Sequence, residues 1–217
     1  LRAAEAALAA GSGHTPIPSP RPAPSVSPRQ ASSSAESCVP RAPERASLVG
    51  HRAPATCVQF HPVFNEVVSG CEDGTVRVWD CELSRFEETI RGHTNSVNGV
   101  DFKPGDGSLL ASCSSDMTVK LWGFGLQQQQ QQQQPQRNCL RTLVGHDHPV
   151  SSVKFTPRGD SLISTSRDGT VKIWDIETGY CTRTLSGHDG WVRASAVSPD
   201  GQFLATAGQD KTVRLWS

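Results

Sequence analysis

The sequence predicts an all-β protein built from four similar units, each of them a small antiparallel sheet. Gly-His pairs recur four times, and a Trp follows each His after 28 or 29 residues. Between the two, short apolar stretches alternate with polar positions and are separated by turn residues, which is typical of short strands. Before each of these Trp residues stands a Thr-Val-basic-aliphatic run. Internal repetition therefore determines the fold class.

In the second unit, the elements follow in this order. Alternation of Val97, Val100 and Phe102 predicts the first strand, and residues 108–112 predict the second. A tight turn follows, and the first and third units have Asp-Gly there, a strong hairpin signal. Residues 118–122 then form the third strand and residues 139–144 the fourth. The corresponding third strands are 75–79, 170–174 and 212–216, and the other fourth strands are 86–91 and 180–185.

Low-complexity segments divide the chain into domains. Residues 1–45 are expected to be a leader, with a proline-rich, polyproline-like or disordered linker at 11–35 preceded by either a frayed helix or more tail at 1–10. The β domain is expected at 46–217, with units at about 50–91, 92–144, 145–186 and 187–217. Eight glutamines at 127–134 lie in an insert, residues 125–138, that should loop out.

Composition excludes several classes of function. The 217 residues carry 21 basic and 21 acidic side chains, and this balance argues against binding nucleic acid or an acidic membrane surface through a cationic field. No apolar run approaches the roughly 18 residues that a membrane span needs. The seven cysteines are widely spaced and form no C-x-x-C pair, which predicts reduced thiols, an intracellular protein and no zinc site.

Each unit repeats a His, a Ser or Thr, an Asp and a Trp in the same order. The four tetrads are His51, Ser69, Asp73, Trp79; His93, Ser112, Asp116, Trp122; His146, Ser164, Asp168, Trp174; and His188, Thr206, Asp210, Trp216. Ser, His and Asp together suggest a hydrolase, but a nucleophile is needed once, beside one cleft, and not in four equivalent places. A hydrogen-bonded chain of these groups satisfies its own donors and acceptors. We therefore expect structural tetrads, no catalytic residue and no enzyme.

Four short strands per ~40 residues, with Gly-His near the start and Trp-Asp near the end, indicate a β-propeller blade. The repeats resemble WD repeats, with Trp79-Asp80 and Trp174-Asp175 intact. The second unit departs with Trp122-Gly123 and the fourth with Trp216-Ser217. These departures weaken the turn that follows the third strand, but the rest of each unit still predicts a blade.

No cofactor is expected, and His146-Asp147-His148 is a poor metal site because His146 belongs to a tetrad.

Propellers bind partners on their faces, and strand direction predicts which residues share one. We define the top face as the one that carries the loop leading into each blade and the turn between its second and third strands. Candidates for partner binding there are Arg91 and Arg141, which precede Gly-His pairs, Arg167 beside Asp168, and Trp191. Tryptophan and arginine dominate interface energetics. The alternatives are a solvated charge for each arginine and packing between blades for Trp191.

Longer stretches narrow the resemblance to the lissencephaly-1 / nuclear distribution family. They are residues 40–51 (PRAPERASLVGH), 60–64 (FHPVF), 109–122 (LLASCSSDMTVKLW), 145–153 (GHDHPVSSV) and 178–181 (TGYC). The resemblance implies the first four blades of a seven-bladed propeller in a noncatalytic adaptor. In that family the propeller follows a Lis-homology dimerisation motif and a coiled coil. It binds the dynein motor domain, partly through basic top-face residues at the positions of Arg91, Arg141 and Arg167.

Partners follow from the same resemblance. It implies cytoplasmic dynein, with NudE-type adaptors and acetylhydrolase catalytic subunits as further partners, at microtubules, centrosome or spindle in the cytoplasm, and a role in transport, nuclear positioning and mitosis. A homodimer requires an upstream Lis-homology region, and no such motif precedes Gly11. The alternative function is another WD-repeat scaffold, such as a ubiquitin-ligase substrate receptor or a chromatin platform.

Departures from the repeat predict where the domain is weakest. Ser195 and Val197 stand where the second and third units have Val and Phe, so the fourth core should be looser. Four blades with seven-blade curvature form an incomplete arc with exposed ends. The chain is therefore expected to be part of a longer protein and to aggregate or remain partly unfolded when it is expressed alone. In a closed ring, residues 46–49 would be the outer strand of the last blade.

Overall fold

The prediction of an all-β fold is confirmed. A computed structural model describes residues 43–124 and 137–217, which contain fifteen strands and no helix. The expected features of residues 1–42, and most of the expected glutamine insert, lie outside the described residues. Among the described residues, no helix is long and apolar enough to cross a membrane.

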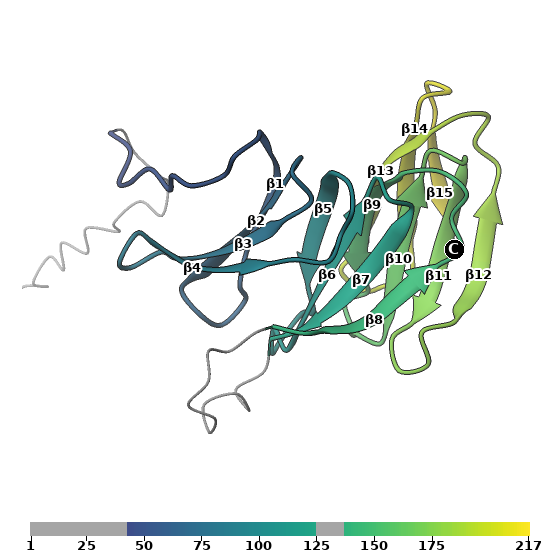
Figure 1. The fold of residues 1–217 in the computed structure, drawn as a ribbon. Helices are drawn as coiled ribbons and strands as arrows, with labels where there is room; N and C mark the ends of the chain where they lie inside the picture. The colour runs from purple at the N-terminus through teal and green to yellow at the C-terminus, as the bar shows by residue number, and fades with distance from the viewer. Residues whose placement is uncertain (1–42, 125–136) are drawn as a thin grey trace, which may run out of the picture. The chain divides into compact units, whose positions relative to one another are not determined.

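The strands form four separate antiparallel sheets, one for each predicted unit (Figure 1). Within every sheet the strands are hydrogen-bonded in chain order, so each is a simple meander. Blade 1 contains β1 (Ala55–Phe60), β2 (Glu66–Cys71), β3 (Val76–Asp80) and β4 (Arg85–Ile90). Blade 2 contains β5 (Val97–Phe102), β6 (Leu109–Ser114), β7 (Thr118–Gly123) and β8 (Cys139–Val144). Blade 3 contains β9 (Val150–Phe155), β10 (Ser161–Ser166), β11 (Thr170–Asp175) and β12 (Cys181–Ser186). Blade 4 contains β13 (Val192–Val197), β14 (Leu204–Gly208) and β15 (Val213–Trp216).

Tight turns join the second and third strands of every blade, as Asp-Gly predicts. Gly74 and Gly169 take positive φ angles of 79° and 81° there. Met117 and Lys211 occupy the same position in blades 2 and 4, with φ angles of 67° and 65°. A residue with a side chain costs about 1–2 kcal/mol in this left-handed region. Blades 2 and 4 therefore keep the same hairpin turn although Met and Lys do not favour its backbone conformation.

The core lies between consecutive sheets, because each blade packs its flat face on the next. One buried cluster joins Val68 and Val78 of blade 1 to Val97 and Trp122 of blade 2. A second joins blade 2 to blade 3, and a third joins blade 3 to blade 4. The first strands of consecutive blades also contact one another, β1 with β5, β5 with β9 and β9 with β13. The sheets are thereby stacked through hydrophobic faces, as in solenoids and propellers.

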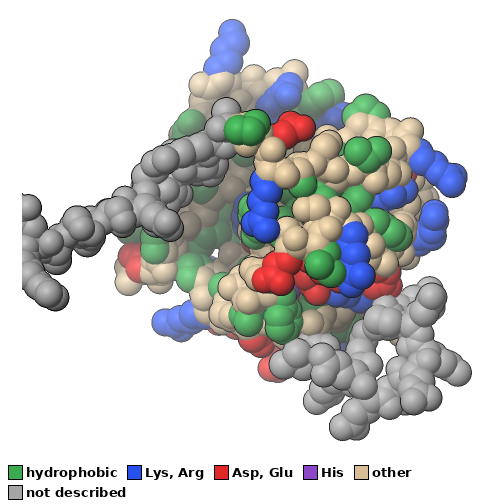
Figure 2. Space-filling model, turned by 90° about the vertical axis from the view of Figure 1, so that its left-hand side faces the viewer, with side chains coloured by type: hydrophobic (Ala, Val, Ile, Leu, Met, Phe, Trp, Pro, Cys, Tyr) green, Lys and Arg blue, Asp and Glu red, His purple; other side chains and the backbone are tan. Residues whose placement is uncertain are grey.

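Blade 4 is less tightly packed than blades 2 and 3. Ser195 and Val197 are half-buried, whereas Val153 and Phe155 at the matching positions of blade 3 are buried. Hydrophobic side chains are exposed on strands of the two outer blades, including Phe60 on β1 and Val213 on β15. Figure 2, which views the molecule from the left-hand side of Figure 1, shows hydrophobic side chains lying between charged ones on the surface. Residues 46–49 form no strand and are exposed, so the expected outer strand has no partner in this structure.

Arg137 joins blades 1 and 2 on the side opposite the top face. Its guanidinium lies 3.2 Å from a carboxylate oxygen of Glu66 and 3.5 Å from one of Glu88, and the side chain is only 15% exposed. It also covers the ring of Phe124 at 3.7 Å from the centroid. Phe124 in turn packs edge-on against Phe102 in blade 2. One cation thus holds two carboxylates and an aromatic ring together across the blade junction.

We predict that Arg137→Ala lowers the free energy of unfolding by about 1–3 kcal/mol. The substitution removes the cation and leaves two half-buried carboxylates close together. Urea denaturation followed by tryptophan fluorescence measures the change. This and the later measurements use a longer form of the protein that closes the ring, because the chain alone is expected to aggregate or remain partly unfolded. Arg158→Ala, in an exposed turn, is the control and should stay within about 0.5 kcal/mol of the unsubstituted chain. Equal stability of the two variants would show that the junction does not depend on this cation.

Candidate functional site

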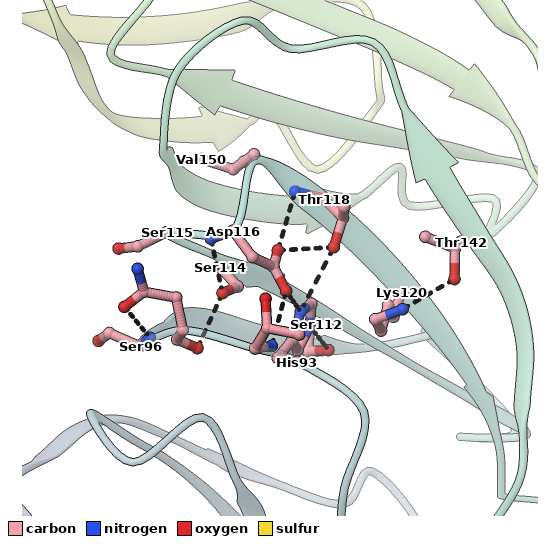
Figure 3. Close-up of polar contacts among 12 residues, drawn as sticks. His93, Ser96, Ser112, Ser114, Ser115, Asp116, Thr118, Lys120, Thr142 and Val150 are labelled. Atoms are coloured by element: carbon pink, nitrogen blue, oxygen red, sulfur yellow. Dashed lines mark hydrogen bonds and ion pairs between the residues drawn. The ribbon is translucent and has the colours of Figure 1, made fainter.

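The second tetrad is a continuous hydrogen-bonded chain, and Figure 3 shows three of its members, His93, Ser112 and Asp116. The indole nitrogen of Trp122 donates to Ser112 Oγ at 2.8 Å. Ser112 Oγ lies 2.8 Å from His93 Nε2, and His93 Nδ1 lies 2.8 Å from Asp116 Oδ2. These groups come from the third strand, the second strand, the loop leading into the blade and the turn after β6. The chain therefore joins the four parts of the blade that meet at its top face.

Blades 3 and 4 repeat the same geometry. His146 Nδ1 lies 2.7 Å from Asp168 Oδ2, and its Nε2 lies 2.7 Å from Ser164 Oγ. The indole of Trp174 donates to that serine at 2.8 Å. In blade 4 the three corresponding distances are 2.8, 2.9 and 2.9 Å, with a threonine hydroxyl in place of serine. The expectation that each quartet lies together holds in these blades.

Charges in the tetrad follow from burial and hydrogen bonding. Burial lowers the pKa of His93 more than its contacts with Asp116 raise it, so the ring is neutral at pH 7. Burial raises the pKa of Asp116, but hydrogen bonds from Thr118 and His93 outweigh it and hold that pKa below its usual value. A neutral ring with Nδ1–H donates to the carboxylate and accepts the hydroxyl proton of Ser112 at Nε2. Every polar side-chain group of the tetrad then has a hydrogen-bond partner.

The tetrad has two further contacts that the sequence reasoning missed. Thr118 donates to Asp116 Oδ1 through its hydroxyl at 2.6 Å and its backbone N–H at 3.0 Å. The backbone N–H of Thr94 donates to the other oxygen, Oδ2, at 3.1 Å. A threonine two residues after each of these Asp residues was visible in the sequence and is the signal that could have found the first contact. The Asp116 carboxylate thus accepts hydrogen bonds from both the turn after β6 and the loop leading into the blade, and it holds the two together.

This geometry serves structure and not hydrolysis. The hydroxyl oxygens of Ser112 and Ser164 belong to completely buried residues and already accept an indole N–H. A nucleophile must instead face a substrate beside oxyanion-stabilising donors. Glycine of the Gly-His pair also has a packing role, because a Cβ on Gly92 would lie 2.8 Å from the Trp122 ring.

Blade 1 departs from the expected tetrad. His51 Nε2 lies 2.6 Å from Ser69 Oγ, and the Trp79 indole donates to that oxygen at 2.8 Å. Among the described residues, however, His51 Nδ1 is buried without a hydrogen-bond partner, so the bond to Asp73 is not formed. The expectation that all four units form the complete chain is wrong for this one. A cysteine, Cys71, stands at the position where blades 2 and 3 have Ser114 and Ser166.

Arg167 and Trp191 come together on the top face. The guanidinium carbon of Arg167, in the β10–β11 turn, lies 4.7 Å from the ring centroid of Trp191, in the loop leading into blade 4. Trp191 thus packs on a side chain of the neighbouring blade and is still 41% exposed, so part of its ring is accessible to a partner. Arg193 lies 5.9 Å from the same ring and was not singled out from the sequence. We call Arg167, Trp191 and Arg193 the top-face cluster.

The other two candidate arginines lie elsewhere. Arg91 is exposed in the connection between β4 and β5, directly before Gly92, as expected for the top face. Arg141 lies on the outer strand β8, and its guanidinium donates to the backbone carbonyls of Glu177 and Thr178. Those carbonyls belong to the β11–β12 turn, at the end of blade 3 opposite the top face. The expectation that Arg141 shares a face with Arg167 is therefore wrong, because its contact is with the neighbouring blade.

The expected absence of a metal at His146-Asp147-His148 is consistent with the bonding of His146. Both ring nitrogens of His146 are occupied by tetrad hydrogen bonds. Neither nitrogen can donate a lone pair to a metal ion unless one of these tetrad hydrogen bonds is broken.

Four segments match the WD domain, G-beta repeat family, at residues 43–80, 84–123, 137–175 and 179–217. The chain belongs to the WD repeat family. These matches and the four meander sheets confirm the predicted blades.

The chain is also similar to fungal nuclear distribution proteins, which confirms the narrower resemblance. It is 46% identical over 153 residues to nuclear distribution protein PAC1 of Arthroderma otae, covering 66% of this chain and 31% of that protein. It is 48% identical over 139 residues to nuclear distribution protein nudF of Aspergillus oryzae, covering 63% of this chain and 28% of that protein. The chain spans about a third of the length of these relatives.

Proposed function

We propose that this chain is part of a noncatalytic adaptor that binds the dynein motor domain and regulates microtubule-based transport, nuclear positioning and mitotic spindle function. The observation that carries the proposal is the top-face cluster. It is an exposed aromatic ring flanked by two guanidinium groups, on a rigid frame, in a chain whose relatives are named nuclear distribution proteins.

The chemistry of the cluster suits an acidic protein surface. Arginine and tryptophan are enriched among residues that dominate binding energy. The ring is held by the cation beside it, so little side-chain entropy is lost on binding. The tetrads of blades 3 and 4 fix the turn that carries Arg167 and the loop that carries Trp191. The partner would therefore meet a preorganised surface.

Binding of purified dynein motor domain to the immobilised chain tests the proposal, with biolayer interferometry as the readout. We expect saturable binding that weakens as ionic strength rises, because opposite charges steer the encounter. Absence of binding at low salt would refute the proposal and favour a different WD-repeat scaffold. NudE-type adaptors and acetylhydrolase catalytic subunits, and residence on cytoplasmic microtubules, are further parts of this proposal.

A further inference from the structure

Three metal-binding side chains meet at the top of blade 1, outside the top-face cluster. His51, Cys71 and Asp73 each offer one ligand atom, and these atoms all lie within 4.8 Å of one another. The three residues come from the loop leading into the blade, the end of β2 and the turn that follows it. This is the place where the other blades form the bond between histidine and aspartate.

Blade 1 does not close as the other blades do, and within the described ranges its histidine keeps an unbonded ring nitrogen. His51 Nδ1 is buried without a hydrogen-bond partner in the described part of the chain. Asp73 Oδ1 accepts the hydroxyl and the backbone N–H of Thr75, at 2.6 and 3.0 Å. In blades 2 to 4 the other oxygen accepts from the histidine and from the residue after it. Among the residues that the structure describes, neither bond forms in blade 1, although a carboxylate oxygen of Asp73 lies within 4.8 Å of a ring nitrogen of His51.

Cys71 distinguishes blade 1 from blades 2 and 3 at the turn where the histidine–aspartate bond is missing. Its Sγ takes the place of the serine hydroxyl, since it lies 3.2 Å from the carbonyl oxygen of Ala53 and 3.5 Å from the backbone nitrogen of Asp73. Ser114 makes the matching contacts in blade 2 at 2.9 and 3.0 Å. Sulfur is larger than oxygen, and both of its contacts are longer than those of the serine hydroxyl, at 3.2 against 2.9 Å and 3.5 against 3.0 Å. The same substitution supplies a soft ligand atom.

Although the cysteine spacing alone predicts no zinc site, we propose that His51 Nδ1, Cys71 Sγ and one carboxylate oxygen of Asp73 bind a zinc ion, with a water molecule as the fourth ligand. Imidazole, thiolate and carboxylate are the ligands zinc takes in proteins, in tetrahedral geometry. Ideal zinc bonds of about 2.0–2.3 Å place ligand atoms roughly 3.3–3.6 Å apart, which lies within the 4.8 Å limit of the three ligand atoms here. Asp73 is exposed, which leaves a path for the ion and the water.

Hydrogen bonding and charge at the three ligands are compatible with binding a zinc ion. In the tautomer that carries its proton on Nε2, His51 donates to Ser69 Oγ, and the lone pair on Nδ1 is left for the metal. Binding converts the Cys71 thiol to a thiolate and releases one proton to solvent. Two ligand charges then neutralise the two charges of the ion, which replaces the missing histidine–aspartate bond.

Titration of the purified chain with Co²⁺ tests the proposal, because a cobalt–thiolate bond has a charge-transfer absorption band and tetrahedral cobalt has visible bands. We expect both features in the unsubstituted chain, and their loss when Zn²⁺ is added. Cys71→Ser should abolish the charge-transfer band and weaken binding at least about tenfold. That variant should fold, since serine occupies this position in blades 2 and 3.

Cys181→Ser, an exposed cysteine on β12, is the matched control and should leave the cobalt spectrum unchanged. Circular dichroism establishes that the Cys71→Ser variant keeps its β structure. A chain without a thiolate band, or a Cys71→Ser variant that binds cobalt as tightly as the unsubstituted chain, would overturn the proposal. The first result would assign the space between His51 and Asp73 to a bridging water.

Discussion

Replacing Asp168 by alanine is expected to lower the free energy of unfolding by about 2–4 kcal/mol. Asp168 accepts from His146 Nδ1 at 2.7 Å, from Thr170 through its hydroxyl at 2.6 Å and its N–H at 2.8 Å, and from the N–H of Asp147 at 3.2 Å. Alanine leaves these donors without the acceptor around which the turn and the loop are built. Equilibrium urea denaturation measures the loss. Asp147→Ala, whose side chain is exposed, is the control and should cost less than about 0.5 kcal/mol.

The same carboxylate gives the protein a pH dependence of defined sign. Burial raises the pKa of Asp168, but the hydrogen bonds from His146 and Thr170 outweigh it and hold the pKa well below its usual value. A depressed native pKa stabilises the fold above the unfolded value of about 3.9. This stabilisation is lost as pH falls below that value toward the native pKa. The stability difference between the unsubstituted chain and Asp168→Ala should therefore narrow between pH 5 and pH 2, and a difference that stayed constant would contradict the assignment.

Charge reversal of Arg167 is expected to weaken binding of the dynein motor domain by at least about tenfold, if the proposed function is correct. Glutamate would repel an acidic partner surface and would leave Trp191 without the guanidinium that lies 4.7 Å from its ring. Biolayer interferometry measures the dissociation constant. Trp191→Ala should cause a loss of similar size, because the ring and the cation form one contact surface.

Arg158→Glu is the matched control for that experiment. Arg158 is exposed in the β9–β10 turn, at the opposite end of the blade from the β10–β11 turn that carries Arg167. It changes the net charge of the chain by the same amount, so it should reproduce any non-specific electrostatic effect. Equal weakening by Arg158→Glu and Arg167→Glu would show that the top-face cluster is not the binding surface.

Much of the fold could be predicted from the sequence because the same pattern of strands and turns occurs four times. Apolar alternation, Asp-Gly turns and the Thr-Val-basic-aliphatic-Trp run located each blade, and strands such as Cys139–Val144 begin and end as predicted. The tetrads of blades 2 to 4 were also predictable, since donors and acceptors at constant spacing must meet in equivalent places. Repetition makes each assignment support the others.

The failures come where one residue changes the outcome of a repeated pattern. His51 and Asp73 fit the repeat, but blade 1 has Cys71 where blades 2 and 3 have serine, and His51 Nδ1 has no hydrogen-bond partner among the described residues. Arg141 was misplaced because its position in the chain does not show that its side chain reaches the β11–β12 turn of the next blade. Arg193 was missed because its nearness to Trp191 depends on how the loop enters β13. Sequence spacing specifies backbone position better than side-chain direction.

A double-mutant cycle on His146 and Asp168 tests most directly whether the quartets hold the blades together, with the pair His51 and Asp73 as the internal reference. Unfolding free energies of the single and double alanine variants yield the coupling energy of each pair. We predict a coupling of about 1–3 kcal/mol in blade 3, where the two side chains are bonded, and less than about 0.5 kcal/mol in metal-free blade 1, where they are not. Additive effects at His146 and Asp168 would contradict the account.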